Sequence, residues 1–176
     1  MNKVGMVEIV TQKRLLKVFE NDLGYEYLGD WQDREGNSNV EEEILTSWLV
    51  TQGHSAAIIT KVLTKLNKTK AVGGAVKLYD ANRAVYDLLR YGVKVKLDAG
   101  ELNQSVSLVD WKNPENNHFA VAEEVTVVGK PHTKRPDIVI YVNGIALGVI
   151  ELKRSTVTVS EGIRQNLDNQ KKEFIE

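Results

Sequence analysis

The sequence has no cysteine, and histidine is scarce, with His54, His118 and His132 as the three occurrences. The absence of cysteine excludes a disulfide framework and any metal site built on thiolates. The histidines show none of the close ligand spacings, such as H-E-x-x-H, that zinc enzymes use, and we expect His118 and His132 to be solvated surface residues. A structural zinc domain is therefore excluded, and a bound metal is expected to take oxygen ligands.

Long apolar runs are also absent. The longest, residues 138–142 and 145–150, fall far short of the ~18 residues of a spanning helix, and charges occur throughout the first twenty residues. We therefore expect a soluble, cytoplasmic protein with no membrane partner. A length of 176 residues corresponds to one domain, and a hydrophobic content of 42% is enough to fill a core.

The net charge of −1 argues against a protein that binds nucleic acid simply by being basic. The charge is unevenly distributed, because residues 129–172 contain eight basic and four acidic side chains. Basic residues in this segment could contact phosphate groups or, equally, be plain solvated charges. The four of most interest are Lys134, Arg135, Arg154 and Arg164.

Apolar spacing divides the chain into a helical first half and a strand-rich second half. The expected helices include residues 15–19, 40–51, 55–66 and 80–91. Alternating apolar residues then predict strands at 93–97, 106–108 and 121–128. Two further runs, 137–142 and 146–152, flank an Asn143-Gly144 turn and predict a hairpin, and Ser160 begins a last helix. The order predicts an α/β fold, more closely α+β, in which a mixed sheet with a central β-meander is flanked by helices.

Three residues at the ends of two expected strands form the candidate site. Asp137 follows Pro136, and Glu151 and Lys153 share one face of the second strand because strand side chains alternate. Two carboxylates suit Mg²⁺, and a lysine can stabilise negative charge that develops on a phosphodiester. A salt-bridged strand edge is the alternative, and Asp110-Trp111-Lys112 shows that an acidic residue two positions before lysine also arises by coincidence.

The turn between these strands decides whether the carboxylates meet. A two-residue Asn143-Gly144 loop without a bulge would pair Val142 with Ile145 and place Asp137 and Glu151 on opposite faces. A three-residue loop that starts at Val142, or an equivalent bulge, would place them on one face. We predict the three-residue loop or such a bulge.

The stretch from Arg135 to Lys153 resembles the nuclease motif of the R (HsdR) subunit of type I restriction endonucleases, in the PD-(D/E)XK superfamily. The resemblance includes residues 108–119 and 80–83, and it extends from about Leu23 to the end. It implies an N-terminal helical region over residues 1–78 and a nuclease core over 79–176 that is truncated at its C-terminal end.

The resemblance also assigns roles. It implies that Asp137 and Glu151 bind the metal, Mg²⁺, and that Lys153 is the catalytic lysine. Gln165 lies where the family has a Q-x-x-x-Y motif, although Asn169 replaces the tyrosine, so a plain surface glutamine is the alternative. Related folds often add a glutamate from an early helix. Glu42 or Glu43 could supply it, but we favour for both a role at the helix N-terminus.

The implied function is Mg²⁺-dependent cleavage of double-stranded DNA, with methyltransferase (M) and specificity (S) subunits as partners. The chain has no G-x-x-x-x-G-K-[ST] motif. We therefore expect ATP and S-adenosylmethionine to act only through a longer, motor-bearing subunit and the complete complex. The alternatives are a catalytically silent DNA-binding or assembly module and another PD-(D/E)XK nuclease, such as a resolvase.

Overall fold

A computed structural model of the chain describes residues 3–70, 77–96, 102–128 and 133–152, together with 163, 164 and 167. Its elements in chain order are α1 (Lys3–Lys17), the π-helix η1 (Val18–Asp22), β1 (Glu26–Asp30), α2 (Glu42–Thr51), α3 (Ala56–Lys70), α4 (Leu78–Tyr91), β2 (Val93–Val95), β3 (Gln104–Val106), the 3-10 helix η2 (Pro114–Asn116), β4 (Phe119–Glu123), β5 (Val127–Val128), β6 (Thr133–Lys134), β7 (Ile138–Val142) and β8 (Ile145–Ile150).

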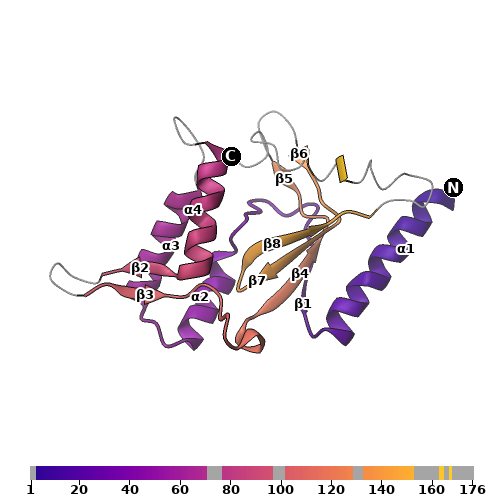
Figure 1. Ribbon diagram of the computed structural model, residues 1–176. Helices are drawn as coiled ribbons and strands as arrows, with labels where there is room; N and C mark the ends of the chain where they lie inside the picture. Colours follow the sequence, from indigo (N-terminus) through magenta and orange to yellow (C-terminus); the bar gives the residue numbers. More distant parts are fainter. Residues whose placement is uncertain are drawn as a thin grey trace.

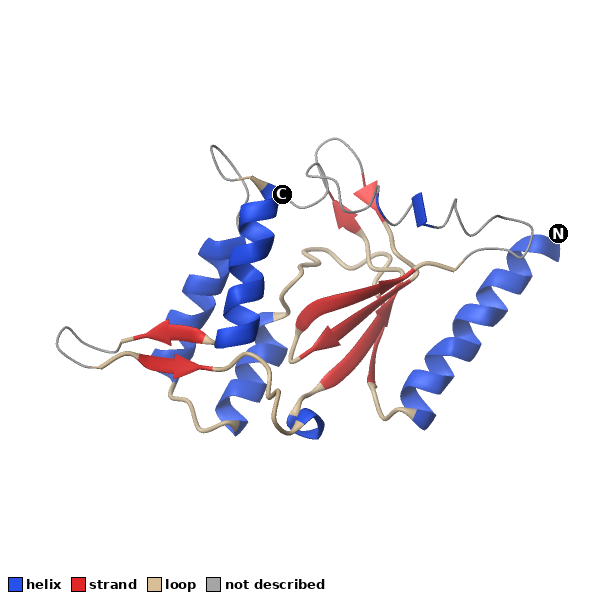
Figure 2. Ribbon diagram, in the orientation of Figure 1, coloured by secondary structure: helices blue, strands red, loops and turns tan. Residues whose placement is uncertain are grey.

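A four-stranded mixed sheet in the order β1-β4-β7-β8 forms the centre of the molecule (Figure 1). β1 runs parallel to β4, whereas β4, β7 and β8 form an antiparallel meander. α1 and η1 cover one face, where Leu16 and Phe19 pack on Val121 and Ile138. The helices α2, α3 and α4 lie on the other side of the sheet (Figure 2). The expected α+β class, with a β-meander flanked by helices, is confirmed.

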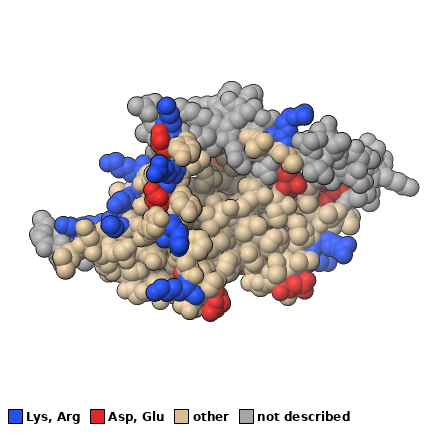
Figure 3. Space-filling model, viewed as in Figure 1, with Lys and Arg blue, Asp and Glu red and all other residues tan. Residues whose placement is uncertain are grey.

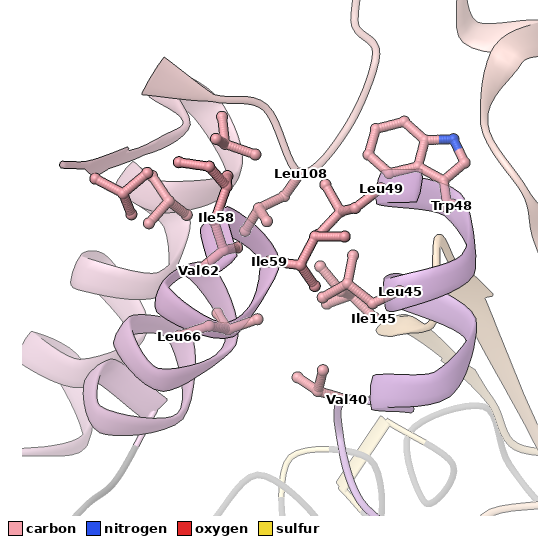
Figure 4. Close-up of a cluster of buried hydrophobic side chains, with 13 residues drawn as sticks. Val40, Leu45, Trp48, Leu49, Ile58, Ile59, Val62, Leu66, Leu108 and Ile145 are labelled. Carbon is pink, nitrogen blue, oxygen red and sulfur yellow. The ribbon is translucent and has the colours of Figure 1, made fainter. Parts of the chain in front are cut away.

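A second hydrophobic cluster holds the helical side together (Figure 4). In α3 the buried residues Ile58, Ile59, Val62 and Leu66 recur at helical spacing and face α2 and the β2–β3 ribbon. Ile145, the first residue of β8, joins the same cluster. Each fully buried aliphatic side chain contributes about 1.5–3 kcal/mol, so this cluster anchors the β7–β8 hairpin to the helices.

The expected helices and most strands occur within a few residues of their predicted bounds, but the first region differs. The first helix is longer than expected and starts at Lys3, and β1 falls where no strand was predicted. Gly29 (φ +112°) and an irregular register disturb the alternation of β1. The run 121–128 is interrupted because Glu124 adopts φ +52° between β4 and β5. The division at residues 78 and 79 stays a prediction.

The last predicted helix lies mostly outside the described residues, of which Ile163, Arg164 and Leu167 are helical. Among the described residues, no helix combines the length and the apolar character that a membrane crossing requires.

The β7–β8 turn is a two-residue loop, so the predicted three-residue loop is wrong. Asn143 (φ +52°) and Gly144 (φ +80°) form it, and Val142 pairs with Ile145. Both positive φ angles match the twist of a tight hairpin. The equivalent bulge is nevertheless present, because Tyr141 pairs with Ala146 but Ile140 pairs with Gly148, which leaves Leu147 as an extra residue. The bulge shifts the register by one residue for every pair beyond it, from Ile140–Gly148 to Ile138–Ile150.

We expect Gly144→Ala to lower the free energy of unfolding by about 3 kcal/mol. A Cβ at residue 144 would lie 2.6 Å from Glu41 O, and a left-handed φ adds a cost for any other residue. Gly36→Ala is the control, since it has φ +73° but open space around the added Cβ, and we expect it to cost about 1 kcal/mol. Urea unfolding of both variants measures the difference, and equal losses would contradict the close approach at Gly144.

Candidate functional site

Asp137 and Glu151 lie at the same end of the sheet, just before β7 and just after β8. Ile138 pairs with Ile150 at the end of the β7–β8 ladder, and extending this register by one position would set Asp137 opposite Glu151. The bulge therefore puts both carboxylates on the face that carries Val139 and Val149, as the predicted site requires. Both residues are half-buried. The backbone N–H of Leu152 donates to Asp137 Oδ2 at 2.5 Å and fixes one carboxylate oxygen.

The donor set fits a hard divalent cation. Carboxylates directly opposite on neighbouring strands repel each other, and a cation between them offsets that repulsion. No cluster of three or more potential metal-ligating side chains occurs in the part of the chain that the structure describes. One or two carboxylates, completed by water and substrate phosphate, are typical of Mg²⁺ sites. Lys153 and Gln165 lie outside the described residues, so their predicted roles stay predictions.

Two further glutamates, not expected from the sequence, lie at the end of β4 beside this site. The side-chain amide of Gln12, which is buried on α1, donates to Glu123 at 2.9 Å and to Glu124 at 3.1 Å. Glu124 also forms an ion pair with Arg135 at 2.8 Å, and its backbone N–H donates to Asp137 O at 3.0 Å. The Glu124 N–H thus holds the backbone carbonyl of Asp137, and Gln12 and Arg135 hold Glu124 in turn. The Glu-Glu dipeptide at the end of an alternating run was a weak signal for them.

Glu42 and Glu43 are far from Asp137. Both lie in the first turn of α2, which starts beside the β7–β8 turn, where Glu41 N–H donates to Gly144 O at 2.7 Å. The turn is at the opposite end of β7 from Asp137, about 20 Å away at the usual rise per strand residue. Their position therefore fits the helix N-terminal role. The helix that reaches the carboxylate end is α1, through Gln12.

The second acidic-x-lysine match has a local structural role. Asp110 Oδ1 accepts the backbone N–H groups of Lys112 and Asn113, each at 3.0 Å. The Asn113 bond is the main reason that the pKa of Asp110 is lowered. The residue thus closes a turn, and it lies on a different segment from the Asp137 end of the sheet.

The structure places the candidate phosphate-binding residues in different surroundings. Lys134 belongs to β6, and Arg135 is held by its ion pair with Glu124. Arg164 is exposed, whereas Arg154 lies outside the described residues. His118 differs from the expected solvated histidine, because its Nε2 lies 2.6 Å from Glu26 Oε2 and its ring is two-thirds buried. His132 is not among the described residues.

A cavity of about 570 Å³ separates the helices from the sheet face that bears the carboxylates. Leu66, Tyr86 and Leu89 line it on the helical side. Val139, Tyr141 and Val149 line it on the sheet side, and Lys134 and Pro136 lie at the part nearest Asp137. Burial raises the pKa of Tyr141, so its hydroxyl stays neutral at physiological pH. The cavity thus lies on the same face of the sheet as Val139 and Val149.

The fold and the paired carboxylates define an α+β protein with an acidic site at one end of its sheet, and comparison with known proteins identifies its family. The chain belongs to the family described as type I restriction enzyme R protein N terminus, whose model matches residues 6–176.

Curated relatives carry matching names. The chain is 27% identical over 177 residues to the putative type I restriction enzyme MjaVIIIP endonuclease subunit of Methanocaldococcus jannaschii, covering 94% of this chain and 16% of the relative. It is 37% identical over 81 residues to the MjaVIIP subunit of the same organism, covering 45% and 7%. It is 40% identical over 75 residues to the HindI endonuclease subunit of Haemophilus influenzae, covering 41% and 7%. The chain thus spans a small part of each relative's length.

Proposed function

We propose that this chain is the nuclease domain of a type I restriction R subunit and cleaves double-stranded DNA in a Mg²⁺-dependent reaction. The observation that carries the proposal is the bulge at Leu147, which brings Asp137 and Glu151 to one face at the end of the sheet. Family membership supports the same reading, because the curated relatives are named as endonuclease subunits.

In this proposal Asp137 and Glu151 hold the cation through their carboxylate oxygens. Mg²⁺ bound there supplies positive charge that polarises the phosphodiester. The Leu152 N–H donates to Asp137 Oδ2 and holds this carboxylate in place at the end of the sheet. Lys153 follows Glu151 by two residues, and its ammonium would stabilise the negative charge that develops on the phosphate. Gln165 would position groups at the same centre.

The partners follow from the same proposal. Methyltransferase and specificity subunits would provide recognition of the DNA site. ATP would act through a motor elsewhere in the full-length subunit, and S-adenosylmethionine through the complete complex. Lys134, Arg135, Arg154 and Arg164 would add sequence-independent phosphate contacts near the cleavage site.

The proposal is tested with a complex assembled from methyltransferase, specificity and R subunits, the last carrying this chain. Glu151→Gln keeps the size of the side chain but removes its charge, and we expect DNA cleavage to fall at least a hundredfold while ATP hydrolysis continues. Glu115→Gln, an exposed position in η2, is the control and should cut at the wild-type rate. Normal cleavage by Glu151→Gln would favour the catalytically silent module.

A further inference from the structure

The most basic part of the chain lies on the helical side of the molecule. Residues 56–96, which include α3, α4 and β2, contain nine basic and two acidic side chains. Residues 1–55 have the opposite balance, with five basic and ten acidic side chains. Figure 3 shows many Lys and Arg side chains, with a few Asp and Glu side chains among them, over the part of the view in which Figure 1 places α4 and β2, beside a hollow. The near-neutral sum of the chain thus hides a segment in which basic residues outnumber acidic ones nine to two.

The outer face of α4 carries aromatic and basic residues in alternation. Tyr79, Arg83, Tyr86 and Arg90 are spaced by four, three and four residues, so they form one stripe along the helix, which we call the α4 stripe. All four are exposed, with Tyr79 and Tyr86 at 71% and 59%. A helix buries its apolar stripe in a core, and in α4 that stripe includes Ala81 on a different face. The α4 stripe is therefore not explained by packing.

The α4 stripe borders, through Tyr86, the cavity between the helices and the sheet. Tyr86 lines the cavity from α4, and Val149, two residues before Glu151 on the same strand face, lines it from the sheet. Two lysines, Lys70 on the helical side and Lys134 on the sheet side, also line it. A polyanion that lies across this opening would contact cations on both walls.

We propose that the α4 stripe binds the phosphate backbone of the DNA duplex outside the cleavage site, which deepens the proposed nuclease function and rests on it. Arg83 and Arg90 provide charge-assisted hydrogen bonds to phosphates, and the tyrosines provide hydroxyl donors and flat surfaces against the sugars. The stripe is about 16 Å long at the rise of an α-helix, which corresponds to about five base pairs of duplex. Such contacts carry no sequence information, which suits an enzyme whose target is read by a partner.

The test measures binding of a short fluorescent duplex to the full chain by anisotropy over a range of salt concentrations, with Ca²⁺ in place of Mg²⁺ to prevent cleavage. We expect Arg83→Gln with Arg90→Gln to weaken binding about tenfold and to lower the slope of log affinity against log salt by about 2, since each lost phosphate contact removes about 0.9. Arg83→Lys with Arg90→Lys keeps both charges and should restore most of the slope. Thermal unfolding confirms that each variant is folded.

Arg14→Gln with Lys17→Gln is the matched control, because it removes two exposed charges from the C-terminal end of α1, on the other side of the sheet. It should bind the duplex as the wild type does. Equal weakening by the control and the α4 variant would overturn the proposal, as would unchanged affinity and slope in the α4 variant. Unchanged DNA binding together with failure to assemble with the other subunits would identify the stripe as a protein interface instead.

The test of the α4 stripe and the test of the nuclease site are independent of each other. Binding in Ca²⁺ does not depend on cleavage, so a weakened α4 variant supports the stripe even if Glu151→Gln still cuts DNA. Conversely, loss of cleavage by Glu151→Gln supports the nuclease site even if the α4 variant binds the duplex normally.

Discussion

Asp137→Asn should reduce DNA cleavage by the assembled complex roughly a thousandfold or more, which corresponds to about 4 kcal/mol of lost transition-state stabilisation. The variant removes one of the two negative charges that would hold the cation. Asparagine keeps an oxygen at the position that accepts the Leu152 N–H, so the local structure is retained. We therefore expect the free energy of unfolding to stay within about 1 kcal/mol of the wild type.

Ligand linkage separates this effect from a general loss of function. A cation that binds only the folded protein raises its stability, so added Mg²⁺ or Mn²⁺ should raise the melting temperature of the wild-type chain and not that of Asp137→Asn. Asp110→Asn is the control, because Asp110 belongs to the other acidic-x-lysine match and closes a local turn. It should retain the metal response and cleavage. A wild-type level of cleavage by Asp137→Asn would remove this carboxylate from the site.

Much of the sheet could be predicted because short apolar runs that flank a turn are a local signal. The runs that became β7 and β8 are apolar on both faces, as expected for strands covered on both sides, and β7 has buried residues on each face. The pairing of Asp137 with Glu151 could be predicted only as a choice between registers. The choice depends on whether Leu147 is accommodated as a bulge, and the turn residues alone do not determine that.

The remaining features depend on contacts between distant segments. Gln12 and Glu123 are 111 residues apart in sequence, and nothing in either segment predicts that α1 crosses the end of β4. The same holds for β1, which is stabilised as a strand by pairing with β4 rather than by its own alternation. The α4 stripe could not be predicted for another reason. Strong apolar spacing predicts that a helix packs on a core, but it does not show which polar and aromatic residues stay exposed on the outer face. Only the observed exposure of Tyr79 and Tyr86 separates its outer face from the core.

Asn143 joins the β7–β8 hairpin to the segment before β4, and it does more than form a turn. Its side-chain amide is fully buried, donates to Leu108 O at 2.9 Å and to Asn117 Oδ1 at 2.8 Å, and accepts the His118 N–H at 2.7 Å. Its own backbone N–H donates to His118 O at 2.7 Å. A buried side chain of this kind is expensive to remove, because each partner left without a hydrogen bond costs about 1–3 kcal/mol.

We expect Asn143→Ala to lower the free energy of unfolding by about 4 kcal/mol, with contributions from the lost hydrogen bonds and from the left-handed φ of +52°. Asn143→Gly separates the two, because glycine accepts that φ and should cost about 3 kcal/mol. Asn116→Ala is the exposed control, since its amide donates to Asp110 Oδ2 at the surface, and it should cost less than about 1 kcal/mol. Urea unfolding measures all three, and a loss below about 1 kcal/mol for Asn143→Ala would show that the amide does not hold the hairpin.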